Sequence, residues 1–366
     1  MLKNSLPFKL TSKRDLNETA KYIARNQYPS GAIPWFRKTI LDPWDHIEAA
    51  MGLSVAGLVE QAKKAFIWMA KMQEPDGGHW PAYEDTIPVD KSRKESHHAP
   101  YLATGLYHYF LITRDRKFLS TMWEHVEAAI EFALNLQGPD GEVYWAILPE
   151  NKIYKDSLIT GCSSIYKSIE CAILIAREIG ITKPRWIEAR EELKIALTQK
   201  NHLFDRTWPS KKRFSMDWFY PVMCGVIRGS QAKKRINEKW PIFVEQGLGC
   251  RCVSDEPWIT VAESCELVIA LLGARMNSRA IKLFNWLHKN RDKDGAYWTG
   301  YQKELKIFWP KEKPTWTAGV LLLAADALLK LTPASNLFLE DWLILKPLLK
   351  RNWFFKKWNK QKGINI

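Results

Sequence analysis

The chain has 366 residues, of which 46% are hydrophobic, and it contains no uninterrupted apolar stretch long enough to span a membrane. Its net charge of +14 comes from 54 Lys and Arg against 40 Asp and Glu, but no recognised nucleic-acid-binding motif accompanies it, so we expect no nucleic-acid partner. The first residues lack the apolar segment of a secretory signal, and the six cysteines form no disulfide framework, which predicts reduced thiols and a cytoplasmic protein.

Two kinds of predicted helix alternate along the chain. One kind shows a single apolar face and is expected on the outside of the fold. These outer helices are predicted at 13–27, 60–73, 118–137, 184–199, 231–246 and 277–290. The other kind is more apolar and rich in small residues, which suit a crowded inner ring. The inner helices are predicted to begin near Asp42, His97, Thr160, Ser215, Val261 and Trp316.

One short phrase recurs four times, at 22–35, 64–80, 132–145 and 279–298. In its clearest copy, apolar residues at helical spacing lead to Gln73, to the turn Asp76-Gly77 and to Trp80. Gly accepts positive φ, so the Asp-Gly pair ends the helix and turns the chain. The Gln amide can bond the exposed groups at a helix end. Repetition of this length indicates one supersecondary unit used several times.

The phrase Lys/Arg–Gly/Ala–x–x–aromatic–aliphatic–x–x–x–Gln–x–Gly–x–Trp resembles the repeat of squalene–hopene cyclases and protein prenyltransferases. Those proteins are α/α toroids, which are rings of six helical hairpins, and glucoamylase-like and unsaturated-glucuronyl hydrolases share the ring. The resemblance covers roughly residues 18–330. It implies an all-α (α/α)6 toroid, a single domain over 1–342, followed by a short basic and aromatic tail over 343–366. Because the repeat belongs to the scaffold, it does not identify the chemistry.

Polar and aromatic clusters stand at the N-terminal ends of the predicted inner helices, and in a toroid those ends meet at one mouth. Asp45, Asp217 and Glu263 are acids in otherwise apolar helical openings, where a carboxylate is costly unless it is paired or functional. We predict Glu263 as a general acid, Asp217 as a general base and Asp45 as an assisting carboxylate, with structural ion pairs as the alternative. The predicted substrate-binding residues are Trp35, Asp42, Trp44, His46, Glu48, His97, His98, Tyr166, Trp218, Tyr220, Trp258 and Trp316.

Three of these residues have a second interpretation. Asp42 precedes Pro43, the arrangement of an N-cap followed by Pro at the first helical position, and either Asp42 or Asp45 can be the working acid. His97 and His98 have no Cys or Asp partner at ligand spacing. We therefore expect no metal, and nothing in the sequence calls for a cofactor.

The main functional hypothesis is a carbohydrate-active enzyme of glycoside hydrolase, lyase or epimerase type. The chain has 18 Trp, on which the flat faces of sugars can stack, and carboxylates across the mouth can supply acid and base. A lyase or epimerase would use His97 or His98 instead. The alternatives are a terpenoid cyclase or prenyltransferase-like enzyme, whose carbocations aromatic rings would stabilise, and a non-catalytic glycan- or lipid-binding toroid. The Asp-x-Asp-Asp motif of the large cyclases is missing, and no prenyltransferase zinc set aligns.

The tail combines bases with large apolar rings. From Leu343 onward there are seven Lys or Arg, all within 346–362, and no Asp or Glu. This composition is typical of a helix on an anionic membrane surface, and the alternative is a solvated extension packed on the toroid. We expect a small-molecule or oligosaccharide substrate, including a lipid-linked or anionic glycan, and a cytoplasmic protein that can sit at the inner membrane.

Overall fold

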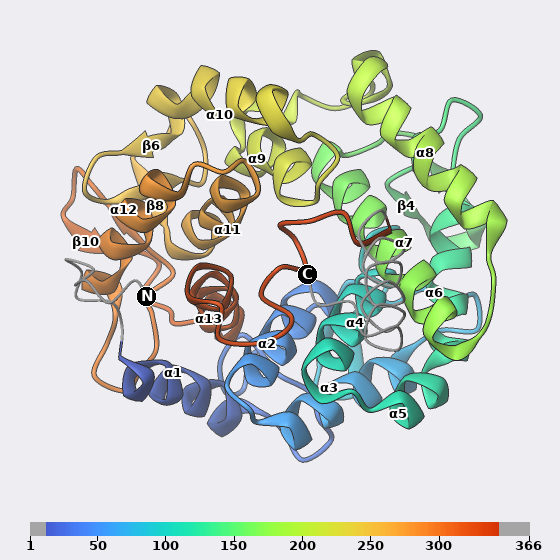
Figure 1. The fold of residues 1–366 in the computed structure, drawn as a ribbon, viewed down its shortest axis with the longest axis horizontal. Coiled ribbons are helices and arrows are strands. Elements are labelled where there is room, and N and C mark those ends of the chain that lie inside the picture. The colour runs from blue at the N-terminus through green and yellow to red at the C-terminus, as the bar shows by residue number, and fades with distance from the viewer. Residues whose placement is uncertain (1–11, 344–366) are drawn as a thin grey trace, which may run out of the picture.

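A computed structural model describes residues 12–343, which form two concentric rings of helices (Figure 1). The inner ring consists of α2 (Pro43–Val55), α4 (Tyr101–Thr113), α7 (Ile159–Ile179), α9 (Ser215–Met223), α11 (Val261–Gly273) and α13 (Thr315–Leu329). The outer ring consists of α1 (Lys13–Asn26), α3 (Val59–Met72), α5 (Arg116–Thr121) with α6 (Trp123–Leu134), α8 (Pro184–Gln199), α10 (Gly229–Phe243) and α12 (Asn277–Leu287). The predicted (α/α)6 toroid is confirmed.

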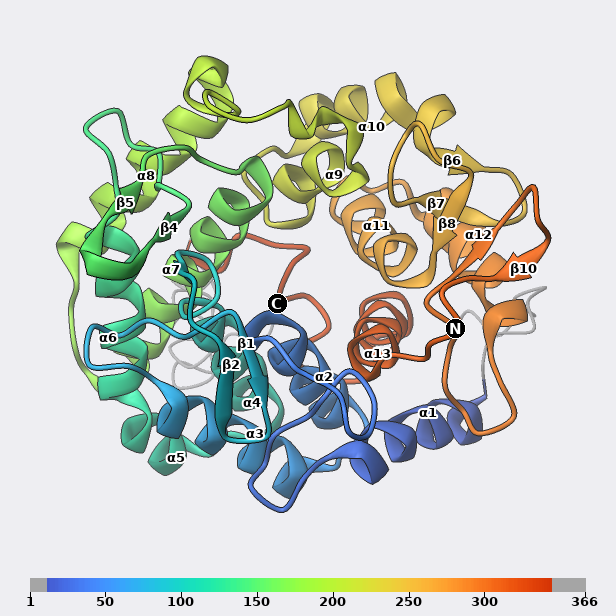
Figure 2. The same ribbon diagram turned by 180° about the vertical axis from the view of Figure 1, so that it is seen from behind.

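Short antiparallel strands, which the sequence did not predict, lie in the connections that lead from outer to inner helices. One hairpin pairs β1 (Ala82–Glu84) with β2 (Ile87–Asp90). A three-stranded sheet joins β3 (Lys94–Glu95), β4 (Ala146–Ile147) and β5 (Ile153–Tyr154). The largest sheet has the order β10-β9-β8-β7-β6, from β6 (Val244–Glu245), β7 (Gly249–Arg251), β8 (Trp258–Thr260), β9 (Gly300–Gln302) and β10 (Ile307–Phe308). Figure 2 looks onto this face, here called the mouth, where the inner helices begin.

Local details differ from the predicted spans for identifiable reasons. The outer helix expected at 118–137 is two helices, and α5 begins where the Asp115 side chain accepts the Phe118 N–H at 2.9 Å. Helix α4 begins at Tyr101 because the residues from Glu95 to Pro100 form a strand end and a turn. Short 3₁₀ helices occupy η1 (Pro149–Asn151), η2 (Asn201–Leu203), η3 (Lys211–Arg213) and η4 (His288–Asn290).

The repeated phrase fastens each outer helix to the next. Gln73 donates from Nε2 to the Gly77 carbonyl of its own turn at 3.1 Å and to the His125 carbonyl of α6 at 2.9 Å. Gln27 and Gln137 make the same pair of bonds in their copies. In the copy without Gln, the Gly295 carbonyl accepts from Thr19 of α1 at 2.8 Å, which closes the ring. The phrase is therefore scaffold.

The inner ring is tightly packed at its small residues. A Cβ on Gly52 would lie 2.7 Å from the Gly319 Cα, so α2 and α13 touch backbone to backbone at this crossing. Among the described helices, α7 has the length and composition of a membrane span, with a mean hydropathy of 1.3. Because 89% of its most apolar segment is buried inside the ring, α7 has the character of a core helix.

The chain after α13 crosses the ring on the face opposite the mouth (Figure 1). Lys167 of α7 donates to the Leu337 carbonyl at 3.2 Å, and Arg228 donates to the Leu339 carbonyl at 2.7 Å. Glu170 accepts the backbone N–H of Trp342 at 3.1 Å. This segment therefore covers the end of the ring opposite the mouth. The basic tail over 344–366 lies outside the described residues.

Candidate active site

A pocket of about 270 Å³ lies at the mouth, and all six inner helices contribute to it through their first two turns or the residues just before them. Its walls combine carboxylates with Trp and His side chains. The lining residues are Asp42, Trp44, Asp45, Glu48, His97, His98, Thr160, Met216, Glu263, Glu266 and Trp316. Convergent polar groups in a concave site of this kind are the default location for an active site.

The start of α2 supplies the first group of carboxylates. Asp42 is the N-cap, with Pro43 at the first helical position, and its Oδ1 accepts the Asp45 N–H at 3.0 Å. Its Oδ2 accepts from Trp35 Nε1 at 3.2 Å. The Trp35 loop is held in turn by Thr315, whose N–H donates to the Trp35 carbonyl at 2.6 Å. Asp42 is thus a cap and a pocket residue at once.

Three carboxyls of the pocket hold their protons more tightly than usual. Burial, together with the neighbouring Asp42, raises the pKa of Asp45 well above its ordinary value. Burial raises the pKa of Glu48 to about 8, against the hydrogen bonds of Trp44 and Tyr101. Burial and the nearby Glu48 raise the pKa of Glu266 well above its ordinary value. A carboxyl that stays protonated near neutral pH can act as a general acid.

The buried acids Glu48 and Glu266 are held by aromatic donors. Glu48 Oε1 accepts from Trp44 Nε1 at 3.0 Å and from the Tyr101 hydroxyl at 3.2 Å. The Trp44 ring stacks on the Tyr101 ring with centroids 4.8 Å apart. The Tyr220 hydroxyl donates to Glu266. These bonds fix the orientation of both acids and of the Trp44 ring.

Glu263 stands in a different situation. It lies in the first turn of α11 and is 8% exposed, and its Oε2 has no hydrogen-bond partner within residues 12–343. A buried carboxylate oxygen without a partner is costly, so it is expected to meet water or substrate in the pocket. Asp45, at the opening of α2, is half-buried. Asp42 is half-buried as well, but its two oxygens already accept from Asp45 and Trp35, so Asp45 and Glu263 are the acids most available to a bound molecule.

A second polar cluster stands on the wall before α4. The Glu95 Oε2 lies 3.5 Å from His97 Nε2 and 3.8 Å from His98 Nε2, and these three are described residues that could hold a metal ion. Arg93 pairs with the same carboxylate at 2.7 Å, and Trp145 Nε1 donates to it at 3.2 Å. Burial, with His98 close by, lowers the pKa of His97 to about 3. Because donors and a guanidinium already face Glu95, the cluster fits a positioned pair of imidazoles better than a cation.

Comparison with known proteins identifies the family. No protein-family model matches the chain. The chain is 45% identical over 321 residues to an MMP endo-(1,4)-3-O-methyl-alpha-D-mannosidase of Mycolicibacterium hassiacum, and the match covers 88% of each protein. The chain belongs to the family of this mannosidase.

Solved structures share the ring with this mannosidase family member. One is a GH63 mannosylglycerate hydrolase from Thermus thermophilus in complex with glucose, with TM-score 0.67, 12% identity, and coverage of 83% of this chain and 98% of that chain. Another is a D-mannose isomerase with TM-score 0.67, 11% identity, and coverage of 90% of this chain and 100% of that chain. At such identities the likeness shows the fold. The identity to the mannosidase shows that this protein is a carbohydrate-active enzyme of glycosidase type. This result confirms the main functional hypothesis and not the terpenoid alternative.

Several predicted site residues lie away from the pocket, and their expected roles need correction. His46 is fully buried between α2 and α3, where Nδ1 accepts the Ile33 N–H and Nε2 meets the Ala65 carbonyl at 2.9 Å. Trp218 donates to the Arg235 carbonyl of α10 and stacks on Phe243. These two residues serve packing between the inner and outer rings.

Asp217 is also turned toward the outer ring. Arg235 donates to its backbone carbonyl at 2.9 Å, and burial raises the pKa of its side chain to about 6 against the charges of Arg235 and Lys239. It does not line the pocket, so it is not placed to act as a base across from Glu263.

The remaining predicted residues stand beside or behind the pocket. Tyr166 does not line the pocket; the Arg190 guanidinium lies over its ring, 3.9 Å from the ring centroid. Tyr220 acts through Glu266, Trp35 acts through Asp42, and Trp258 lies in β8 on the mouth. Glu266, which lines the pocket, was missed, although it follows Glu263 by one helical turn and therefore shares its face.

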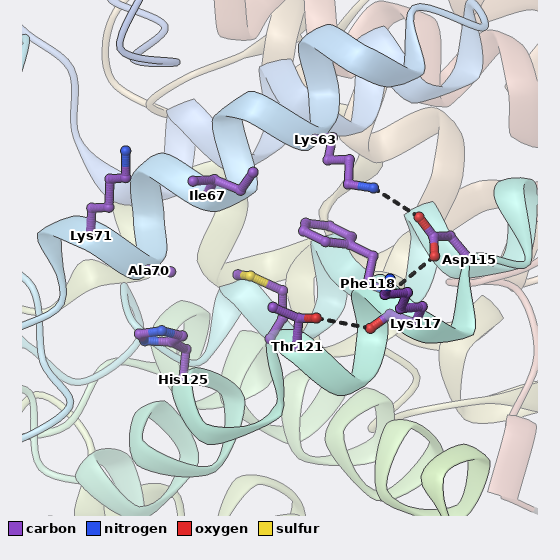
Figure 3. A pocket seen from close by; sticks show the side chains of 10 residues that line it. Lys63, Ile67, Ala70, Lys71, Asp115, Lys117, Phe118, Thr121 and His125 are labelled. Carbon is purple, nitrogen blue, oxygen red and sulfur yellow. Dashed lines mark hydrogen bonds and ion pairs between the residues drawn. The ribbon is translucent and has the colours of Figure 1, made fainter.

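A larger hollow of about 640 Å³ lies on the outer surface between α3, α5 and α6 (Figure 3). Its one lining carboxylate, Asp115, is paired with Lys63 at 2.9 Å and caps α5. No cluster of acids converges there among the described residues. This hollow therefore lacks the convergent carboxylates of the smaller pocket at the mouth.

Proposed function

We propose that the protein is an endo-acting glycoside hydrolase that cleaves (1→4) bonds between 3-O-methylated α-mannosyl residues. The support is the 45% identity to a mannosidase of that description over 88% of both proteins. The observation that carries the proposal is the pocket that both Asp45 and Glu263 line. Asp45 has a raised pKa, and one oxygen of Glu263 has no hydrogen-bond partner among residues 12–343.

In the proposed mechanism Asp45 is the general acid. Its proton passes to the glycosidic oxygen as the bond from that oxygen to the anomeric carbon breaks. Glu263 is the general base that accepts a proton from the water attacking the anomeric carbon. The atoms balance, since one water is consumed, Asp45 ends as a carboxylate and Glu263 ends protonated. A base in this role implies inversion at the anomeric carbon.

The other pocket residues bind and orient the sugar. Trp316 and the Trp44 ring, fixed by its bond to Glu48, offer faces for the C–H surfaces of a pyranose. His97 and His98, which line the pocket beside Glu95, form its wall on the side of α4. Glu48 and Glu266, which accept hydrogen bonds from aromatic side chains, act as positioning residues in this proposal.

Hydrolysis of 3-O-methylated (1→4)-α-mannosyl oligosaccharides tests the proposal, with product lengths separating internal from terminal cleavage. We expect Asp45→Asn and Glu263→Gln to lose activity by about 100-fold or more. Asp217→Asn is the matched control, since it makes the same change on an inner helix outside the pocket, and it should keep wild-type activity. A wild-type protein without activity on these chains, or either variant with full activity, would contradict the assignment.

The basic tail over 346–362 supports a further proposal on location. Its Lys, Arg and aromatic residues fit a cytoplasmic protein that contacts an anionic membrane surface, where a lipid-linked glycan would be met. Removal of residues 346–366 should weaken the sedimentation of the protein with anionic vesicles. With neutral vesicles, neither the full chain nor the truncated protein should sediment. Unchanged binding after the truncation would contradict the proposal.

A further inference from the structure

The mouth carries most of the exposed large apolar side chains in residues 12–343. Of the exposed large hydrophobic residues in the described part of the chain, most lie in the connections that lead into inner helices. These are Ile87, Val89, Ile153, Phe214, Leu305, Ile307 and Trp309, whereas Ile187, Ile195, Ile242 and Leu331 lie elsewhere. Exposed apolar groups gathered on one face, beside a polar pocket, point to a ligand that brings apolar surface of its own.

The densest group stands on the hairpin of β9 and β10. Leu305 is 66% exposed, Trp309 is 50% exposed and Ile307 is 40% exposed. Trp258 of β8 supports this hairpin: its Nε1 donates to the Trp309 carbonyl at 2.7 Å, and the two rings meet edge to face at 5.1 Å. We call Trp258, Leu305, Ile307 and Trp309 the aromatic platform.

The platform is built into the sheet rather than carried on a loose loop. Trp258 and Gln302 are partners in the ladder between β8 and β9, and the Trp309 N–H donates to the Gly300 carbonyl at 3.0 Å. A Cβ at Gly300 would lie 2.6 Å from Trp258 Nε1, so only Gly allows the indole to lie where it does. The ring positions are therefore fixed before any ligand arrives.

The platform is joined through the chain to one wall of the pocket. Strand β8 runs directly into α11, whose first turn carries Glu263, and the residues after Trp309 lead into α13, where Trp316 lines the pocket. The same two connections thus hold both the platform and one wall of the pocket. On the mouth, β8 and β10 lie on the same side of the ring as α11 and α13, so a chain that leaves the pocket on this side runs toward the platform (Figure 2).

We infer that the aromatic platform is a remote binding site for the methylated part of the substrate chain, beyond the sugar units at the cleaved bond. This inference rests on the proposed function. A pocket of about 270 Å³ is smaller than a typical small-molecule site, so most of a polysaccharide lies outside it. Each 3-O-methyl group replaces a hydroxyl donor by apolar surface, which Leu305 and Ile307 can cover while Trp309 stacks on a sugar face.

Titration calorimetry on the Glu263→Gln protein separates this inference from the catalytic assignment, because it needs no turnover. The probes are a 3-O-methylated (1→4)-α-mannosyl disaccharide and hexasaccharide, and the hexasaccharide without methyl groups. Adding Trp309→Ala or Leu305→Ser should weaken methylated hexasaccharide binding by about tenfold, with the disaccharide unchanged and the unmethylated chain less affected. Ile195→Ser, an equally simple change on the exposed side of α8, is the control that should change nothing.

Kinetics on the otherwise wild-type protein give the second readout. Trp309→Ala should raise KM for the long methylated chain and leave kcat as it was. An equal loss for short and long chains, or no loss, would overturn the inference while the proposed function stands. If the wild-type protein neither binds nor cleaves methylated mannosyl chains, the proposed function fails and this inference fails with it.

Discussion

The backbone N–H of Asp45 donates to the Asp42 Oδ1 at 3.0 Å, one helical turn apart at the opening of α2. Asp42 thereby caps the helix and holds its charge beside the Asp45 carboxyl. After burial, that charge is the main reason that the pKa of Asp45 stands well above its ordinary value. The residue that starts the helix is also the residue that keeps the proposed acid protonated.

Asp42→Asn tests this link. Asn caps a helix about as well as Asp, so the fold should persist, but the charge that raises the pKa of Asp45 disappears. The pKa of Asp45 should fall, and the alkaline limb of the kcat/KM profile should move to lower pH. Asp115→Asn, the same change at the cap of α5 away from the pocket, should leave the profile where it is. A profile that Asp42→Asn does not move would mean that Asp45 is not the acid.

Glu48 should make stability depend on pH. Burial raises its pKa from the ordinary 4.5 to about 8 in the folded state, so the folded protein binds this proton more tightly than the unfolded chain. The stability lost through Glu48 therefore grows as pH rises from about 4.5 and is complete above about 8.

In Glu48→Gln that loss is absent. The free energy of unfolding of the variant should exceed that of the wild type increasingly between pH 5 and pH 8, by on the order of a few kcal/mol at the upper end. Urea unfolding at a series of pH values measures the difference. Glu60→Gln, on the exposed side of α3, is the control and should follow the wild-type curve. A pH-independent difference for Glu48→Gln would show that its carboxyl is ionised throughout.

The ring could be predicted because its signals are local. Apolar inner helices alternate with amphipathic outer ones, and the Gln and Asp-Gly of the repeated phrase mark the points where one outer helix meets the next. The mouth followed from the topology, since every inner helix begins on the same face. That reasoning alone brings Asp45, Glu48 and Glu263 into one neighbourhood, and the structure places them in one pocket.

The rotation of each inner helix could not be predicted. Successive residues turn by about 100° around a helix, so neighbours of a pocket residue point elsewhere. His46 follows Asp45 but points to α3, and Asp217 follows the pocket residue Met216 but points to α10. An inner helix is apolar on all sides, so no amphipathic stripe fixes its rotation. The pocket position of Glu266 could have been predicted, since an acid one helical turn from Glu263 shares its face.

The buried ion pairs of α7 should be a main support of the closed end. Glu170 is 1% exposed and pairs with Lys167 at 3.0 Å and with Arg190 at 2.8 Å, while it also accepts the Trp342 N–H. Glu170→Ala leaves two buried cations without this partner, which should destabilise the fold by about 3–5 kcal/mol in urea unfolding. Glu191→Ala removes a largely exposed partner of the same Arg190 and should have little effect. Similar losses in both variants would mean that burial adds nothing to the network.

The turns of the repeated phrase should differ from ordinary turns in their tolerance of a side chain. Gly77 and Gly57 have similar positive φ values, +87° and +79°. A Cβ at Gly77 would lie 2.2 Å from the Ala128 carbonyl oxygen of the next outer helix, whereas a Cβ at Gly57 meets nothing within 4 Å. Gly57→Ala should therefore lose only about 1–2 kcal/mol of stability from backbone strain. Gly77→Ala adds a collision with the Ala128 backbone and should lower the free energy of unfolding by about 1–3 kcal/mol more than Gly57→Ala does. Urea unfolding measures both losses. If the two variants lose the same stability, the turn does not fasten the outer helices together, and the ring is held by its inner helices alone.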